Sequence, residues 1–379
     1  MDSRISQFAD QLVNYCTEVK KGELVIIQAN DGTPIEMIEA VIDSVNRAGG
    51  TVASVWLGND RITRKVNMQL TPHAERVCHV GPLNQAMATQ VFIVFRGFDN
   101  MYELADVPKE QMRMVSTGMG KHLQDQRIQH TRWILTRMWT PGMAQLAGMS
   151  QSAFYDYYMN TVLLDYDRMS RAMDPLFDLV NEAAEVQIKG PGETDLRFSI
   201  AGIGAVKCDG KRNIPDGEVY TAPVRESMEG VIQYNTVTVT KEGQRFENVR
   251  FVVEKGRIME ATCGSGDVRR LNDFLDTDAG ARYFGEFAFG LNPHIRLPIG
   301  ETLFDEKIAG SFHLTPGQSY TGTPAENGNN SAIHWDIVCI QRPEFGGGEI
   351  WLDGVLIRKD GIFVPERLQG LNPDQLVKV

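Results

Sequence analysis

The chain has 379 residues, of which 42% are hydrophobic and 23% are charged. This is the composition of a globular protein that can bury a core, and it argues against a disordered chain. The formal net charge of −11 argues against a protein that binds nucleic-acid phosphates, and no apolar run is long enough to predict a membrane span.

The first half of the chain alternates between predicted helices and strands. A helix is predicted over residues 3–20, and an apolar strand follows at 23–29. An amphipathic helix begins after Thr33-Pro34 and ends at Gly49-Gly50. Further strands are predicted at 51–57, 90–96 and 132–137, and further helices at 70–88, 109–129 and 150–183. Such alternation predicts parallel strands that are covered by helices.

The pattern changes near residue 185, where strands separated by Gly and Pro turns begin. They are predicted at 185–189, 194–200, 231–240, 249–254, 331–340 and 349–356, with one convincing helix at 267–281. At roughly 150 residues per domain, the length fits two domains. We therefore expect an α/β chain in which a parallel α/β scaffold domain, residues 1–184, precedes a β-rich α+β domain, residues 185–379.

Several motifs are missing from the sequence. No GxGxxG follows the first strand and no GxxxxGK[ST] occurs, so the first domain is expected to be a scaffold rather than a nucleotide site. The five cysteines lack CxxC spacing, and the first residues do not read as a signal peptide. Reduced cysteines in a cytoplasmic protein are the simpler interpretation.

Two segments of the second domain pair candidate metal ligands. His334 and Asp336 lie two apart in the predicted strand 331–340, so they would share one face while Trp335 takes the other. His313 and Tyr320 are separated by a Pro-Gly turn, at which the chain can reverse and bring their side chains together. Either pair alone is also compatible with a purely structural role.

Two carboxylates add to these pairs. Glu286 precedes an apolar run, and Glu218 follows a turn and begins a strand-like segment. A carboxylate that enters a core is costly unless it is paired or binds a metal. Together these segments supply three carboxylates, two imidazoles and a phenol, a set that suits Zn²⁺, Mn²⁺ or Co²⁺. The set exceeds the needs of one tetrahedral site, but two ions that share a bridging carboxylate would use it.

In their order along the chain, these residues resemble the M29 family of metallo-aminopeptidases, of the aminopeptidase T and aminopeptidase S type. The resemblance extends over nearly the whole chain and is most specific in four segments: NIPDGEVYTAP, YFGEFAFGLNP, LFDEKIAGSFHLTPGQSY and SAIHWDIV. It implies an aminopeptidase that hydrolyses the N-terminal peptide bond of peptides with two metal ions (Zn, Co or Mn). It also implies a homodimer.

The resemblance further implies a role for each candidate. The metal ligands would be Glu218, Glu286, His313, Tyr320, His334 and Asp336, with one glutamate bridging the two ions. Glu306 is implied as the general base or as an extra ligand, and Asp305 competes for that role. Tyr320 would either ligate an ion or stabilise the oxyanion of the tetrahedral intermediate.

Two alternatives stay open. The stretch GLNP after Glu286 is also similar to a divergent branch of the superfamily, the Fe(II)-dependent 2,5-dihydroxypyridine dioxygenases. Those enzymes have a histidine at the position of Glu286 and keep the HxD pair. The complete set of candidate ligands in this chain favours the peptidase. In the second alternative, the cluster holds the domain together without catalysing a reaction.

Overall fold

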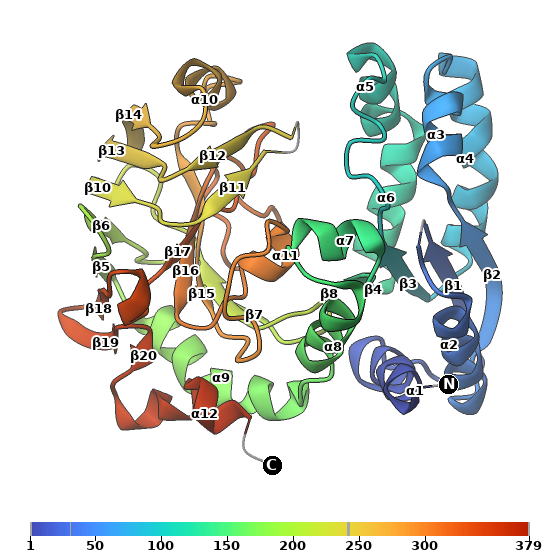
Figure 1. Cartoon of the computed structure of the whole chain (residues 1–379), viewed down its shortest axis with the longest axis horizontal. Coiled ribbons are helices and arrows are strands. Elements are labelled where there is room, and N and C mark those ends of the chain that lie inside the picture. Colours follow the sequence, from blue (N-terminus) through green and yellow to red (C-terminus); the bar gives the residue numbers. More distant parts are fainter. Residues whose placement is uncertain (1, 31, 241–242, 378–379) are drawn as a thin grey trace. The chain divides into compact units, whose positions relative to one another are not determined.

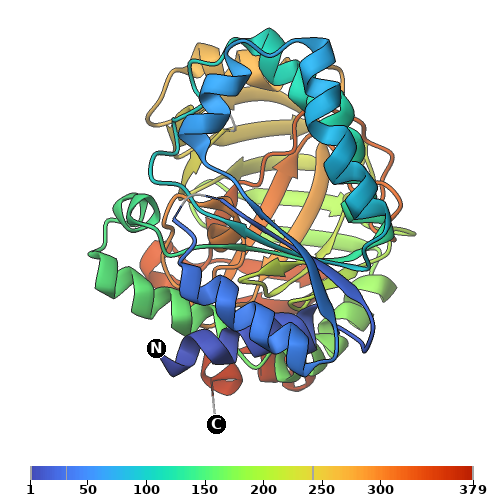
Figure 2. The same cartoon turned by 90° about the vertical axis from the view of Figure 1, so that its right-hand side faces the viewer.

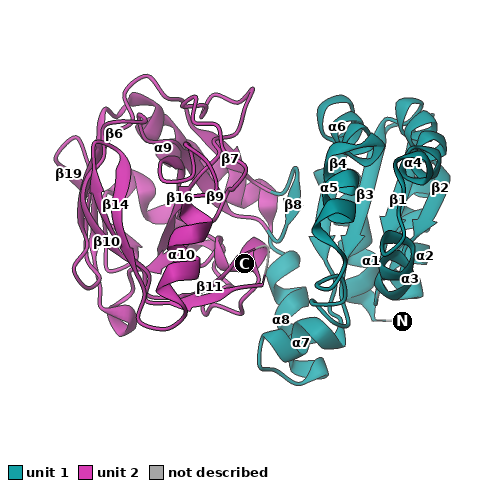
Figure 3. Ribbon diagram, turned by 90° about the horizontal axis from the view of Figure 1, so that it is seen from above, with its two compact units in different colours: residues 1–164, 210–215 teal, residues 165–209, 216–379 magenta. Residues whose placement is uncertain are grey.

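The structure is a computed structural model that describes residues 2–30, 32–240 and 243–377. The chain divides into two compact units, Met1–Leu164 with Gly210–Pro215, and Asp165–Asp209 with Asp216–Val379 (Figure 3). Residues 165–184 thus pack within the second unit, although they precede the predicted start of the β-rich domain. Among the described helices, none combines the length and the apolar character that crossing a bilayer requires.

The first unit is built on a five-stranded sheet in the order β2-β1-β3-β4-β8, and each neighbouring pair is parallel. The strands are β1 Leu24–Ala29, β2 Thr51–Leu57, β3 Val91–Arg96, β4 Arg132–Arg137 and β8 Asn213–Ile214. The helices are α1 Ser3–Asp10, which continues as the π-helix η1 Gln11–Cys16, α2 Ile35–Arg47, α3 Asp60–Asn67, α4 Pro72–Met87, α5 Lys109–Thr117, α6 Met119–His130, α7 Pro141–Leu146 and α8 Gln151–Val162.

Helices cover both faces of this sheet (Figure 2). On one face Ile26, Phe92 and Val94 pack with Ala86 of α4 and Leu123 of α6. The alternate strand residues are also buried, since all of β3 from Val91 to Phe95 is inaccessible to solvent. Burial on both faces explains the continuous apolar run of β3, whereas the edge strand β2 is exposed at every second residue.

The second unit consists of antiparallel sheets (Figure 1). An eight-stranded sheet has the order β14-β13-β10-β6-β5-β18-β19-β20, a five-stranded sheet the order β17-β16-β15-β9-β7, and β11 pairs with β12. The strands are β5 Glu185–Lys189, β6 Asp195–Ser199, β7 Val206–Cys208, β9 Glu218–Thr221, β10 Glu229–Gln233, β11 Val237–Val239, β12 Arg245–Glu247, β13 Arg250–Glu254, β14 Arg257–Thr262, β15 Phe284–Gly290, β16 Ser311–Pro316, β17 Val338–Ile340, β18 Glu349–Leu352, β19 Val355–Lys359 and β20 Ile362–Phe363. The helices are α9 Tyr166–Glu182, α10 Val268–Leu275, α11 Thr302–Asp305 and α12 Pro373–Leu376, with 3₁₀ turns η2 Pro343–Phe345 and η3 Glu366–Leu371.

The two large sheets of the second unit pack through aromatic side chains of β15. Phe287 contacts Phe198 of β6 at a ring separation of 5.3 Å, and Phe289 contacts Phe363 of β20 at 6.2 Å. Because side chains alternate along a strand, the intervening residues of β15 face the opposite side. One face of β15 therefore forms the core, and the other is available for a functional site.

The predicted fold class, a parallel α/β region followed by a β-rich region, is confirmed. Three predicted strands differ from the structure by more than one residue at an end. The segment predicted at 231–240 forms β10 and β11, and 349–356 is divided between β18 and β19 by a turn at Asp353-Gly354. Of 331–340, only Val338–Ile340 is a strand.

Candidate metal centre

The register of three neighbouring strands brings the first three candidate ligands together. Glu286, Ala288 and Gly290 alternate along one face of β15. On either side of this strand, β9 places Glu218 opposite Gly290, and β16 places His313 opposite Ala288. The residues of β15 that pair with these two ligands are small, and the backbone of residues 306–308 packs closely against Gly290.

The remaining pair comes from the loop before β17, not from a strand as predicted. The backbone of this loop is held by Gln318, whose N–H donates to the carbonyl of Ile333 at 2.7 Å. The ring of His334 contacts the Gln318 carbonyl through Nδ1 at 2.7 Å, which leaves Nε2 facing the cluster. Thr315 Oγ1 donates to Asp336 Oδ1 at 2.7 Å. The pair therefore converges through loop hydrogen bonds rather than strand alternation.

Trp335, between these two residues, points to the other side as the sequence predicted. It is 4% exposed, and its ring packs edge-on against Phe274 at 5.3 Å and Phe246 at 6.0 Å. This aromatic contact anchors the segment that carries His334 and Asp336.

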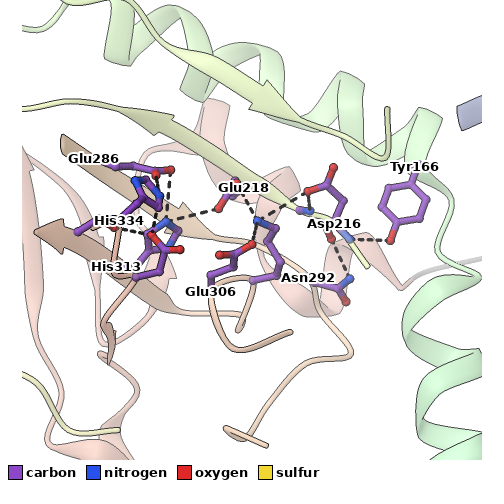
Figure 4. A network of polar contacts seen from close by, with 12 residues as sticks. Tyr166, Asp216, Glu218, Glu286, Asn292, Glu306, His313 and His334 are labelled. Carbon is purple, nitrogen blue, oxygen red and sulfur yellow. Dashed lines mark hydrogen bonds and ion pairs between the residues drawn. The ribbon is translucent and has the colours of Figure 1, made fainter. Parts of the chain in front are cut away.

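The ligand atoms converge on two positions that share one carboxylate (Figure 4). Glu286 Oε1 lies 3.4 Å from His313 Nε2, and Glu286 Oε2 lies 3.2 Å from His334 Nε2. Glu218 Oε2 lies 3.6 Å from His313 Nε2, and Asp336 Oδ1 lies 3.2 Å from His334 Nε2. Two groups result, Glu218/Glu286/His313 and Glu286/His334/Asp336, and within each the ligand atoms lie within 4.8 Å of one another.

Both groups have the character of divalent-cation sites. Glu218 Oε2 and His334 Nε2 are buried and have no well-aligned hydrogen-bond partner within the described part of the chain. Buried polar atoms in proteins are normally paired, so these two indicate space for a ligand. Each group offers two carboxylates and one imidazole, a donor set that fits Zn²⁺, Mn²⁺ or Co²⁺.

The same contacts shift the pKa values of the ionisable groups. Burial lowers the pKa of His313, but the carboxylates of Glu286 and Glu218 outweigh it and raise that pKa to about 9. Burial likewise opposes the charge of His334, whose pKa is nevertheless raised well above its usual value by Asp336 and Glu286. Protons and a metal ion therefore compete for these two imidazoles.

Tyr320 follows β16, Ser311–Pro316, in a loop. Its ring contacts the ring of His334 at 4.8 Å and that of Tyr220 at 5.4 Å. The residue is 44% exposed, so it lies at the solvent side of the cluster. The structure thus places Tyr320 beside His334, where its hydroxyl is a candidate for contact with a substrate or an ion.

The adjacent acids at 305 and 306 point in different directions. Asp305 accepts hydrogen bonds from the backbone N–H groups of Ile299 at 2.7 Å and Gly300 at 2.9 Å. Glu306 forms an ion pair with Lys307 at 2.6 Å and belongs to the polar network in Figure 4. Burial raises the pKa of Glu306, and the charges of Glu218 and Asp336 add to that effect, while Lys307 opposes it. Glu306 is therefore the acid that faces the cluster.

Lys307 is a site residue that sequence reasoning missed. Its Nζ lies 2.7 Å from Glu218 Oε1 and 3.9 Å from Asp216 Oδ1, and its side chain is 1% exposed. Burial alone would lower the pKa of Lys307, but Glu218, Glu306 and Asp216 raise it well above the usual value. The sequence signal for burial of this lysine is that the apolar residues Ile308 and Ala309 follow it directly.

Comparisons with known proteins identify the family of the chain. A sequence model of the family described as thermophilic metalloprotease (M29) matches residues 1–361. Aminopeptidase T of Thermus aquaticus is 35% identical over 172 residues, which cover 42% of this chain and 39% of that protein. Aminopeptidase T of Thermus thermophilus is 34% identical over 210 residues, 49% of this chain and 48% of that protein. The matched segments thus span about half, or less, of the curated relatives.

Two solved structures share the fold. Wild-type AmpT from Thermus thermophilus has a TM-score of 0.78 and 21% identity, and the alignment covers 96% of this chain and 99% of that one. The 2,5-dihydroxypyridine dioxygenase from Pseudomonas putida KT2440 has a TM-score of 0.63 and 14% identity, and the alignment covers 97% of this chain and 99% of that one. At these identities both similarities concern the fold alone.

Proposed function

Since the chain belongs to the thermophilic metalloprotease family (M29), a family of hydrolases, we propose that it is a metal-dependent aminopeptidase. It would hydrolyse the N-terminal peptide bond of peptides with two divalent ions, Zn, Co or Mn. The names of the curated relatives, aminopeptidases, support the class of substrate. The homodimer that the resemblance implies stays a prediction.

The observation that carries this proposal is the placement of Glu286. One of its carboxylate oxygens faces His313 and the other faces His334, at 3.4 and 3.2 Å. A carboxylate with one oxygen toward each of two ligand groups would be able to hold an ion in both of them. Glu218 and Asp336 then complete one group each.

When bound, two such ions activate water and polarise the carbonyl group of the scissile bond. The chain supplies the remaining functions. Glu306, which lies beside the cluster in an ion pair with Lys307, would accept a proton from the attacking water and pass it to the leaving amine. Tyr320, whose ring contacts that of His334, would donate a hydrogen bond to the oxygen on which negative charge develops.

The two acids at 305 and 306 are expected to respond differently to substitution. Glu306→Gln is expected to lower kcat by about 10²–10⁴-fold, the usual contribution of a general base, with unchanged metal content. Asp305→Ala leaves two buried N–H groups unpaired and is expected to cost about 1–3 kcal/mol of stability, with a much smaller loss of kcat. Steady-state kinetics and thermal unfolding of both variants check this. The reverse pattern would assign the base to Asp305.

The direct test compares matched peptides whose α-amino group is either free or acetylated. The metal-loaded protein is expected to release residues stepwise from the free N-terminus and to leave the acetylated peptide intact, as followed by mass spectrometry. Elemental analysis of the same sample is expected to find Zn, Mn or Co. Cleavage at internal bonds, or no cleavage of either peptide by the metal-loaded protein, would contradict the proposal.

The dioxygenase alternative fits the donor set less well. Non-haem iron oxygenases use two histidines and one carboxylate, whereas each group here has one histidine and two carboxylates. Consumption of O₂ with 2,5-dihydroxypyridine after anaerobic loading with Fe(II) would favour that alternative.

A further inference from the structure

Lys307 places its ammonium group inside the candidate metal centre. Its ammonium contacts Glu218 Oε1 at 2.7 Å and Glu306 Oε1 at 2.6 Å, and Asp216 Oδ1 lies 3.9 Å away. The three carboxylates lie in one network in Figure 4. Only 1% of the Lys307 side chain is exposed, so carboxylates rather than water surround its ammonium.

The backbone around Lys307 fixes its position. Its carbonyl accepts a hydrogen bond from the N–H of Asn292 at 2.9 Å, and its own N–H donates to Phe304 at 3.0 Å. The turn rests against β15 at Gly290, where a Cβ atom would clash with the carbonyl of Ile308. The ammonium is therefore held by the packing of the turn as well as by its ion pairs.

Lys307 also accounts for a third cluster of possible ligands. Cys208, Asp216 and Glu218 have ligand atoms within 4.8 Å of one another, as in the two groups described above. In this cluster, however, both carboxylates already face the ammonium. We therefore assign no metal ion to this cluster, since the ammonium of Lys307 already balances the charge of its carboxylates.

The ammonium of Lys307 therefore makes the charge around the two candidate metal positions unequal. Glu218 shares its charge between Lys307, on Oε1, and the group of His313, on Oε2. The carboxylates of the other group, Glu286 and Asp336, face imidazoles, and among the described residues neither forms an ion pair with the ammonium. A divalent ion on Glu218 would be repelled by the nearby ammonium and attracted by a partly neutralised carboxylate.

We propose that Lys307 acts as a resident cation that weakens one of the two metal positions. The group Glu286/His334/Asp336 holds its ion tightly, and the group Glu218/Glu286/His313 holds a weak, exchangeable ion. This inference rests on the proposed two-ion function, and it names the residue that sets the difference in affinity between the two positions.

The test is a titration of metal-free protein with Zn²⁺ by calorimetry, together with elemental analysis after desalting. Wild type is expected to keep one ion per chain and to bind the second at least about tenfold more weakly. Lys307→Gln is expected to tighten the second step by at least about tenfold. The matched control is Lys359→Gln, which removes a lysine paired with Glu349 at 3.1 Å on the other large sheet, and it should titrate as wild type.

A second variant keeps the proposal testable if Lys307→Gln does not fold. Glu218→Gln is expected to abolish only the weak step and to retain one tightly bound ion. Loss of both ions in this variant, or equal affinity of both steps in wild type, would overturn the inference and leave the proposed function standing. Protein that binds no divalent ion at all would contradict the proposed function itself.

Discussion

Replacing Glu286 with alanine is expected to lower kcat/KM for an aminopeptidase substrate by at least about 10³-fold, because the variant lacks the one carboxylate that faces both ligand groups. Loss of the ions would raise the free energy of the transition state by several kcal/mol. Each 1.36 kcal/mol corresponds to about a tenfold change in rate. His334→Ala is expected to behave similarly, since it removes the only imidazole of one group.

The matched control is Glu254→Ala, which removes an exposed glutamate at the end of β13. It should retain wild-type kinetics. Circular dichroism establishes that each variant is folded before its rate is measured. Full turnover in folded Glu286→Ala and His334→Ala would remove the cluster from the reaction.

Removing the metal ions is expected to abolish hydrolysis and to lower the unfolding temperature by roughly 10 °C. An ion present at about 1,000 times its dissociation constant stabilises the folded state by about 4 kcal/mol. In a unit of this size, each kcal/mol corresponds to roughly 2–4 °C. The stabilisation is lost because Glu218, Glu286 and Asp336 remain close together without the ions between them.

The measurement is differential scanning fluorimetry before and after dialysis against a chelator, with metal content checked by elemental analysis. Adding back Zn²⁺, Mn²⁺ or Co²⁺ should restore both activity and unfolding temperature, whereas Mg²⁺ should not, because it prefers an octahedral shell of oxygen atoms. An unchanged unfolding temperature in protein shown to be metal-free would contradict a stabilising metal centre.

Local patterns were sufficient to predict most of the fold. The strands at 51–57, 132–137 and 185–189 were predicted at the bounds observed for β2, β4 and β5. Their apolar residues are contiguous or alternate, and Gly or polar residues bound them, so the information is present within each segment. The candidate ligands could likewise be picked out in the sequence, because each lies beside a turn or an apolar run.

The parts that were missed depend on contacts between distant segments. His334 and Asp336 converge without a strand because Gln318 and Thr315 hold them. The apolar residues after Lys307 do not show which carboxylates surround it. Only the fold brings Glu218, which is far away in the chain, to its ammonium. Hydrogen bonds of this kind leave no periodicity in the sequence from which they could be predicted.

The short strand β8 has a consequence for how the protein is made. The first sheet includes β8, whose residues follow β5, β6 and β7 of the second unit, and the N–H of Leu135 on β4 donates to the carbonyl of Arg212 beside it. During synthesis on the ribosome, the edge of β4 that pairs with β8 stays unpaired until this segment emerges. A gene cut at codon 184 would leave that edge permanently open, so the two halves cannot be separated there without exposing a surface prone to aggregation.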